Sequence, residues 1–528
     1  MFVLLQVVVA LVGLYLIKTF LTRKQFPAPL PPGPKAKPII GNLWDLPSQT
    51  GRDWLHWYKY RDTYGPISSV NVFGETLIIV NDAQIAVELL EKRSANYSER
   101  PTGHFSQLAG FHQIVTTLQY SDPRLRAQRK LFQKQFGSNN SVAMYNSTQE
   151  AEAARFLLRV LDTPEDVQDH IRKQAGAMIL KMTYGYNVAP RGKDPLVELV
   201  SRCMQQFAAS LMPGAWIVDF IPFLKHTPTW IPGISFPRVA KAFREDNRNW
   251  SERPYAFVKQ QMANGTHEPS FVSGLVEKEG FPEPGSDKDD LFKWTALAIY
   301  GAASDTTIAT TYSVFIAMAV FPEVQRKAHE EIDRVIGTGR IPGYADRENL
   351  PYINAMVKEA FRWHTVIPMG VAHNAKEDDM FEGYFIPKGA QVLANLWAFT
   401  HDPTIYSDPM TFKPERFLES DTHTPERDPH FLSFGFGRRV CAGRTLADAN
   451  VYLSIVQSLA ALQISKPIKD GKEVDIQPDF LPGVISHVGR VDLDIKPRSK
   501  QHEELIRALG SKYPFEKDHA EEINRVKF

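Results

Sequence analysis

The sequence predicts a mainly α fold with small β-sheets, preceded by a single N-terminal transmembrane helix. Three observations support this prediction: an apolar N-terminal run, an alternating hairpin pattern from Ile67 to Val80, and helical patterns of which the longest runs from Asp290 to about Phe321. The 528 residues, 43% of them hydrophobic, can bury a large core. We find no internal repeat and expect an anchor (1–22), a proline-rich hinge (23–38), a main domain (39–499) and a charged surface tail (500–528).

The apolar run from Phe2 to Leu21 has nearly the length, ~20 residues, that a helix needs to cross a bilayer. A cleaved signal peptide is the alternative, but the run has no basic start and no small-residue cleavage site follows it. Basic residues gather on its C-terminal side, and the positive-inside rule then places the rest of the chain in the cytosol: Lys18, Arg23, Lys24, Lys35 and Lys37. The following stretch PAPLPPGPKAKP predicts a stiff spacer between membrane and main domain.

The main domain begins with ISSVNVFGETLIIV, which alternates around Gly74 and Glu75 like a hairpin and is followed by a helical pattern to Lys92. Further along, Leu211 to Phe243 interleaves aromatic residues with prolines. Aromatic residues in such a setting usually cover a core. The alternative is an amphipathic lid that enters the membrane interface.

Charge and cysteine count exclude several classes of function. The net charge is +1, which gives no reason to expect a nucleic-acid partner. The only cysteines are Cys203 and Cys441, too few for a disulfide framework or a four-thiolate metal site.

Cys441 lies in the stretch FGFGRRVCAG, residues 434–443. One cysteine suffices as a metal ligand when it is the axial thiolate of a haem iron. The neighbouring residues suit that use. Gly435 and Gly437 let the backbone approach a flat macrocycle, and Gly443 lets the following helix start against it. Arg439 is placed to hold a haem carboxylate, and Phe434 would shield the sulfur. The alternative is a buried structural cysteine in a turn.

This stretch fits the signature F-x-x-G-x-R-x-C-x-G at every position, and here the sequence resembles the cytochrome P450 family of haem-thiolate monooxygenases. The resemblance runs from the hinge to about Pro497. It implies the cytochrome P450 fold for residues 39–499, with haem b (iron protoporphyrin IX) bound through the Cys441 thiolate. Within the family, the stretch VKEAFRWHTVIPMGVAHNAKEDDMFEGYFIPKG looks most like fungal enzymes of secondary metabolism.

A second motif concerns the scaffold. Glu359 and Arg362 in KEAFR lie on one helix face, and Arg416 follows in PERF. Such a pair on its own is ordinary on solvated helices. The resemblance implies that the three residues form a buried triad that holds the haem-binding core.

A third motif is AASDTT, at residues 302–307, within an otherwise apolar helix. Polar groups in such a helix are costly unless each has a partner, which points to a use. Thr306 resembles the family threonine that hydrogen-bonds oxygen, and Asp305 the acid that passes protons inward. The alternative is a hydroxyl bonded back to the preceding turn. Ala303 departs from the family, which usually has glycine there.

A weaker correspondence concerns the haem propionates. The stretch YSDPRLRAQRK resembles the family's W-x-x-x-R helix, with Arg129 as a propionate partner and Leu125 in place of the tryptophan. His373 is a second candidate for the same contact. An apolar substrate pocket is expected from seven further residues: Phe105, Phe111, Ala302, Val366, Ile367, Val484 and Ile485.

The resemblance predicts a monooxygenase that inserts one oxygen atom from O2 into a hydrophobic polyketide, terpenoid or alkaloid, at the endoplasmic reticulum membrane. No G-x-G-x-x-G loop or flavin domain is visible, so electrons must come from a separate protein. The family implies NADPH–cytochrome P450 reductase, docked on a basic face with Arg438, Arg439 and Arg444, and cytochrome b5 is a second candidate partner. The alternatives are a haem-thiolate isomerase or dehydratase that needs no reductase, which Asp305 and Thr306 argue against, and a non-catalytic haem sensor.

Overall fold

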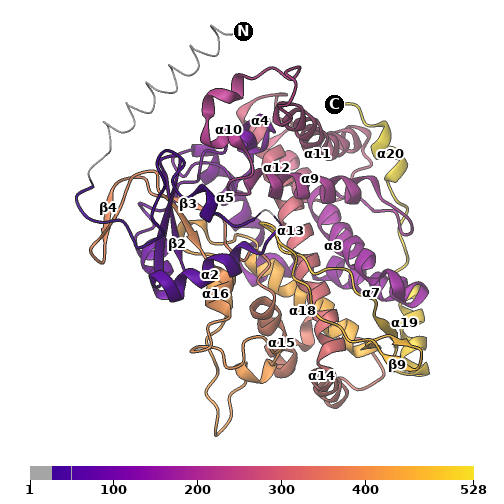
Figure 1. The fold of residues 1–528 in the computed structure, drawn as a ribbon. Coiled ribbons are helices and arrows are strands. Elements are labelled where there is room, and N and C mark those ends of the chain that lie inside the picture. The colour runs from indigo at the N-terminus through magenta and orange to yellow at the C-terminus, as the bar shows by residue number, and fades with distance from the viewer. Residues whose placement is uncertain (1–25, 49) are drawn as a thin grey trace.

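The computed structural model describes residues 26–48 and 50–528, so the predicted membrane anchor lies outside the described residues. Helices make up most of the fold (Figure 1), which agrees with the predicted mainly α class. Within the described ranges, no single helix passes a length and hydropathy test for crossing a membrane, although α13 (Asp287–Val320) and α14 (Pro322–Val335), bent by 104°, pass it as a pair.

The predicted hairpin is confirmed. Strands β1 (Ile67–Val72) and β2 (Glu75–Val80) pair antiparallel across Phe73 and Gly74. Both turn residues have positive φ, 51° and 91°, as a two-residue type I′ turn requires. In the four-stranded sheet, β2 then pairs parallel with β6 (Gln391–Ala394), and β6 antiparallel with β3 (His373–Asn374).

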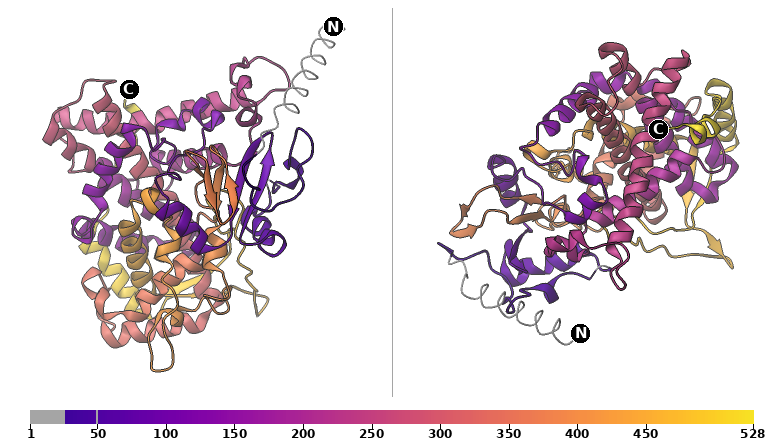
Figure 2. Two further views of the ribbon diagram at one scale, coloured as in Figure 1. Left: turned by 90° about the vertical axis from the view of Figure 1, so that its left-hand side faces the viewer. Right: turned by 90° about the horizontal axis from the view of Figure 1, so that it is seen from above.

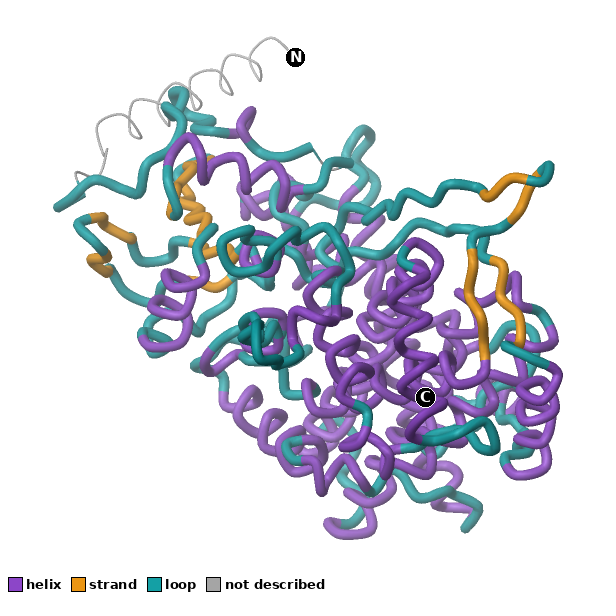
Figure 3. Tube along the Cα trace, turned by 90° about the horizontal axis from the view of Figure 1, so that it is seen from below, coloured by secondary structure: helices purple, strands orange, loops and turns teal. Residues whose placement is uncertain are grey.

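The other strands form short antiparallel pairs: β4 (Asp379–Phe381) with β5 (Tyr384–Ile386), β7 (Leu462–Ser465) with β10 (Asp494–Pro497), and β8 (Ile468–Lys469) with β9 (Lys472–Glu473). Figure 3 shows two groups of strands on opposite sides of the helices. From the side, the four-stranded sheet stands at one edge of the helical body (Figure 2, left).

The helical body consists of the long helix α13 and the helices around it, namely α5 (Pro123–Phe136), α7 (Asn146–Asp162), α8 (Val167–Tyr184), α9 (Pro195–Leu211), α11 (Phe236–Asn264), α12 (Phe271–Glu279), α15 (Pro351–Trp363) and α18 (Arg444–Ala461). Shorter helices border the sheet and the loops: α2 (Asp53–Tyr64), α3 (Ala83–Val87), α4 (His104–Leu108), α6 (Asn139–Ala143), α10 (Ile217–Phe220), α16 (Leu396–Thr400) and α17 (His430–Ser433).

Helix α13 is the predicted long helix and packs against α8, α18, α9 and α11 in the middle of the body. At its start, the Ser286 hydroxyl accepts a hydrogen bond from the Asp289 N–H. The helix ends before Phe321, and the next residue, Pro322, starts α14. It is buried on almost all sides, as expected of a helix whose apolar residues do not keep to one stripe.

The charged C-terminal segment packs more closely than a surface tail. Residues 500–528 form α19 (Lys500–Lys512) and α20 (Ala520–Arg525), whose Ile506 and Ile523 are fully buried. Helix α19 packs on α7, and α20 on α9 and α11. A few buried apolar residues among many charges thus fix this segment to the helical body.

Candidate active site

The loop that carries Cys441 is shaped by glycine and by one cross-loop hydrogen bond. The Cys441 N–H donates to the Phe434 carbonyl at 2.9 Å, which closes residues 434–441 into a tight turn. Gly435 and Gly437 have positive φ, 75° and 53°, and a Cβ at Gly437 would lie 2.3 Å from the Leu90 carbonyl oxygen. Only glycine fits at Gly437. Gly443 then precedes the first turn of α18.

The Cys441 side chain is exposed although it lies deep within protein mass. Burial raises the pKa of the Cys441 thiol, while the Gly443 N–H, Arg129 and Arg444 act in the opposite direction. An accessible thiol at such depth must face an internal space rather than the outer surface. The other cysteine, Cys203, is fully buried and its Sγ lies 3.6 Å from the Asp246 carbonyl.

The middle of α13 also opens onto an internal space. Ala302 is exposed and Thr306 half-buried, whereas the helix on either side is buried. Ala303, Val366 and Ala442 pack against one large hydrophobic cluster, so α13, the segment after α15 and the cysteine loop all border it. The Thr306 hydroxyl donates to the Ala302 carbonyl at 2.8 Å, the back-bonded arrangement that the sequence left open as an alternative.

Three buried or half-buried arginines gather beside this space with no carboxylate bonded to any of them in the described parts of the chain. Arg439 donates to the carbonyls of Ser98 (2.8 Å), Val115 (3.3 Å) and Leu118 (2.6 Å), and Arg129 to that of Val440 (3.1 Å). Arg100 donates to the carbonyls of Val371 and Ala372, and its Nε is buried without an acceptor.

Burial is the main reason why these guanidinium groups are destabilised in their charged form. Burial lowers the pKa of Arg439 to about 10, with partial opposition from Glu99. Burial and then the charge of Arg439 lower the pKa of Arg100 well below its usual range. The pKa of His373 is lowered well below its usual range by burial and by Arg100, and its Nδ1 donates to the Tyr97 carbonyl at 2.6 Å.

An uncompensated group of cations beside an accessible thiol fits haem b, which brings two propionates and an iron that binds thiolate. The structure thus places Arg129, Arg439 and His373 in one cluster and adds Arg100, which the sequence analysis missed. Nothing around Arg100 in the sequence distinguishes it from a solvated arginine. Leu125, which stands in place of the family tryptophan, is buried and apolar, 1% exposed, and so offers a propionate no hydrogen bond.

One part of the predicted docking face is wrong. Arg438 and Arg444 are exposed, but Arg439 is only 9% exposed and directs its guanidinium inward to three carbonyls. An arginine in that position cannot form part of an outer docking face.

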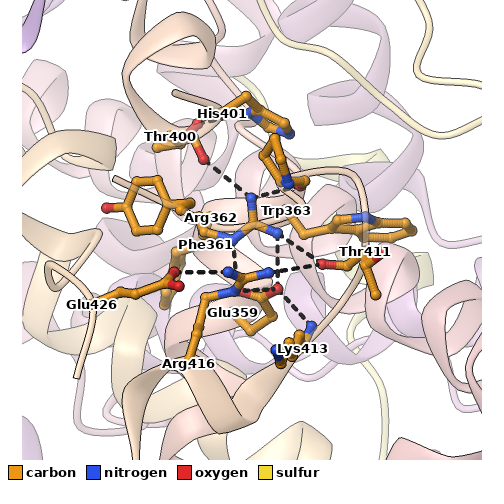
Figure 4. Close-up of polar contacts among 12 residues, drawn as sticks. Glu359, Phe361, Arg362, Trp363, Thr400, His401, Thr411, Lys413, Arg416 and Glu426 are labelled. Carbon is orange, nitrogen blue, oxygen red and sulfur yellow. Dashed lines mark hydrogen bonds and ion pairs between the residues drawn. The ribbon is translucent and has the colours of Figure 1, made fainter. Parts of the chain in front are cut away.

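The predicted triad residues come together in the core (Figure 4). Glu359 accepts from Arg362 Nε at 2.6 Å and Nη2 at 2.8 Å, and from Arg416 Nε at 3.2 Å. All three side chains are fully buried. Arg416 also pairs with Glu426 at 2.7 Å, and Glu426 is a fourth member that no motif indicated.

The predicted pocket residues divide into two groups. Phe105 and Phe111 are fully buried, Phe105 stacked on Trp216 at 3.5 Å and Phe111 edge-on to Phe207 at 5.4 Å. Ala302 is exposed, whereas Val366, Ile367 and Val484 are half-buried and Ile485 is buried. Val484 lines a cavity of about 70 Å³ together with Met369 and Leu211, but neither Cys441 nor Thr306 lines it.

His430, in α17 directly before the cysteine loop, is expected to make the free energy of unfolding depend on pH. Burial opposes its charged form, but hydrogen bonds to Asp428 (2.7 Å) and Asp448 (3.1 Å) overcome this and raise the pKa of His430 to about 9. A raised pKa in the folded state stabilises the fold fully below the unfolded value of about 6.5, and this contribution is lost as the pH rises to about 9.

We therefore expect His430→Gln to lower the free energy of unfolding at about pH 6 by on the order of 1–3 kcal/mol, and much less at about pH 9. Urea unfolding at the two pH values measures the difference. A gap between wild type and variant that does not narrow with rising pH would show that His430 acts only through packing on Phe434.

Comparison with known proteins agrees with the geometry. The family model Cytochrome P450 matches residues 31–488. The chain is 45% identical to cytochrome P450 monooxygenase ppsD of Aspergillus oryzae over 529 residues, covering 100% of both chains. It is 45% identical to cytochrome P450 monooxygenase claR of Ampulloclitocybe clavipes (96% of this chain, 93% of the relative) and 42% identical to O-methylsterigmatocystin oxidoreductase of Aspergillus flavus (98% and 97%). These matches span nearly the whole chain and confirm the resemblance drawn from the cysteine loop, so the chain belongs to the cytochrome P450 family of monooxygenases, whose cofactor is haem b with an axial cysteine thiolate.

Proposed function

We propose that this monooxygenase inserts one oxygen atom from O2 into a hydrophobic intermediate of fungal secondary metabolism, of polyketide, terpenoid or alkaloid type. The observation that carries the proposal is the accessible thiol of Cys441, deep inside the protein, in a loop that borders the same hydrophobic cluster as α13 and the segment after α15. The names of the relatives support the substrate class, since O-methylsterigmatocystin oxidoreductase is named for a secondary metabolite.

In this proposal Cys441 is the axial ligand, since the only other cysteine is buried against Asp246. Arg100, Arg129, Arg439 and His373 would hold the propionates, because no carboxylate in the described part of the chain is bonded to the three arginines. Phe434, which packs on Phe361 with ring centroids 5.0 Å apart, would keep water from the sulfur, while Gly435 and Gly443 would give the macrocycle room. Haem b, when bound, supplies the oxygen-activating chemistry.

The chain's own contribution to that chemistry is the handling of protons and substrate. We assign proton transfer to Asp305 and Thr306, which are adjacent in the accessible stretch of α13 that begins at Ala302. Substrate contacts are assigned to Ala302, Val366, Ile367, Val484 and Ile485. Phe105 and Phe111 would support the residues that contact the substrate and would not contact it themselves, because both are fully buried.

Thr306→Ala is expected to leave the haem spectrum and substrate binding near normal while product per NADPH falls about tenfold and hydrogen peroxide rises. The reason is that the Thr306 hydroxyl affects whether oxygen ends in product or in peroxide, and affects the rate of electron transfer much less. The measurement is product, peroxide and NADPH in the same reaction. Thr310→Ala, four residues further on and buried, is the matched control, since among residues 26–48 and 50–528 its hydroxyl bonds only to the Thr306 carbonyl. Unchanged coupling in Thr306→Ala would count against the assigned role.

We also propose a single-pass protein of the endoplasmic reticulum with a cytosolic catalytic domain. The apolar run Phe2–Leu21 supports an anchor. Large apolar side chains are exposed near the N-terminus and in the loop around α10, which supports a second membrane contact: Trp44 (71% exposed), Phe223 (80%) and Trp230 (78%).

Removal of residues 1–24 is therefore expected to release the protein from membranes only in part. The exposed aromatic residues of the α10 loop would still bind the interface. Flotation with vesicles, with and without Phe223→Ser and Trp230→Ser in the shortened chain, measures the residual binding. Complete release of the shortened chain at low salt would remove the second contact.

Electrons are proposed to come from NADPH through NADPH–cytochrome P450 reductase, with cytochrome b5 as a further donor. The docking face would include the exposed Arg438 and Arg444 but not Arg439. The test of the function is product analysis after candidate pathway intermediates are added to microsomes that contain the protein, reductase and NADPH. Product formed without NADPH would favour an isomerase or dehydratase, and no product from any intermediate would favour a haem sensor.

A further inference from the structure

Asp305 is held by a residue that no motif indicated. The Asp305 Oδ2 lies 3.2 Å from His487 Nε2. This contact joins the accessible stretch of α13 to the loop formed by residues 481–488. The Asp305 side chain is 15% exposed and that of His487 34% exposed. The histidine is therefore more accessible to water than the carboxylate that it contacts.

The loop that carries His487 is fixed in place by backbone hydrogen bonds. The Ser486 N–H donates to the Val366 carbonyl at 2.7 Å, and the Leu481 N–H donates to the His487 carbonyl at 2.7 Å. Val484 and Ile485, assigned above to the substrate, belong to the same loop. The position of His487 relative to Asp305 is thus set by the same segment that borders the substrate.

The surroundings of His487 leave Asp305 as its one charged partner among the hydrogen bonds and ion pairs of residues 26–48 and 50–528. A second titratable group near His487 is His364, which directly follows α15. Burial, followed by the charge of His487, lowers the pKa of His364 to about 3, so His364 is neutral at physiological pH. His364 Nε2 lies 3.4 Å from the Ser486 hydroxyl.

We propose that His487 is a positioning residue that holds Asp305 and renews its proton from solvent; this rests on the function proposed above. In its charged form the imidazolium Nε2–H passes its proton to Asp305 Oδ2. The neutral imidazole keeps its other proton on Nδ1, so the ring turns to bring the vacant Nε2 to water, takes up a proton there and returns to Asp305. One proton thus moves inward in each cycle and nothing else is consumed.

The sign of the pH dependence follows from the charge. Histidine is the side chain that ordinarily changes charge near neutral pH, and only its protonated form can both pair with the carboxylate and donate to it. Product per NADPH should therefore fall as the pH rises. This profile is absent if the histidine acts only as a structural contact.

The test compares His487→Gln with His267→Gln. Glutamine keeps a hydrogen-bond donor but does not titrate, and His267 is a matched control because it pairs with Glu277 at 2.9 Å on the surface. We expect His487→Gln to keep the haem spectrum and the rate of NADPH use, to lower product per NADPH roughly threefold or more, and to flatten its pH profile. His267→Gln should behave as wild type. An unchanged pH profile and coupling in His487→Gln would overturn the proposal.

A second measurement does not depend on turnover. In protein labelled at histidine, the Nε2 signal assigned to His487 through His487→Gln should change its chemical shift in Asp305→Asn, because the ring nitrogen loses its carboxylate partner. An unchanged signal would overturn the pairing in solution. Failure of the proposed function is separate, since wild type would then form no product with reductase and NADPH whatever the outcome for His487.

Discussion

Cys441→Ala is expected to abolish the thiolate-type carbon monoxide spectrum of the reduced protein completely. The reason lies in the supply of thiols: the chain has two, and the second, Cys203, is fully buried in α9. The methyl group of alanine leaves an accessible space where the ligand should be. The spectrum of the purified, reduced protein is the measurement, with haem content determined separately.

Cys203→Ala is the matched control for this variant. Cys203 makes one weak contact, from Sγ to the Asp246 carbonyl at 3.6 Å, and burial raises the pKa of its thiol well above the usual range. The control should keep the thiolate spectrum and lose only a little stability. A thiolate spectrum that survives in Cys441→Ala, or disappears in Cys203→Ala, would contradict the assignment of the ligand.

The cysteine loop could be predicted because its physical requirements are local. Ten consecutive residues specify the turn, the thiol and the glycine at Gly437 that clears the Leu90 carbonyl. The hairpin and α13 were predictable for the same reason, since turn residues and apolar patterns act over a few neighbours.

Arg100 and His487 could not be predicted in this way because their roles come from contacts between distant parts of the chain. Arg100 bonds to carbonyls 271 and 272 residues away, and His487 to an aspartate 182 residues away. The surroundings of Phe105 likewise depend on a distant segment. Its apolar character suggested a pocket wall, but the aromatic loop after α9 provides Trp216, which stacks on it.

The C-terminal segment illustrates how composition can mislead. Its many charges predicted a tail on the surface. Two isoleucines, Ile506 and Ile523, are nevertheless fully buried, and α19 and α20 pack against the helical body. The average charge of a segment is a poor guide when a few apolar side chains determine the packing.

Glu359→Gln is expected to have the largest effect on stability. Glu359 is the only carboxylate bonded to Arg362 in the described residues, and it also accepts from Arg416 and from the Lys413 N–H at 2.7 Å. Removing its charge leaves a guanidinium fully buried and without a counter-ion. Loss of one partner of a buried ion pair costs roughly 3–5 kcal/mol, a large share of the stability of a folded domain.

The expected result is poor expression, loss of haem and a strongly lowered urea midpoint. Glu426→Gln tests the same network more mildly, because Glu426 is 12% exposed and Arg416 keeps Glu359 as a partner. Glu330→Gln is the surface control: its partner Arg326 is 60% exposed, and such pairs contribute about 0–1 kcal/mol. The expected order of destabilisation is Glu359, then Glu426, then Glu330. If Glu359→Gln unfolded at the same urea concentration as Glu330→Gln, the buried charges would be compensated elsewhere and the triad would not be what holds this part of the core.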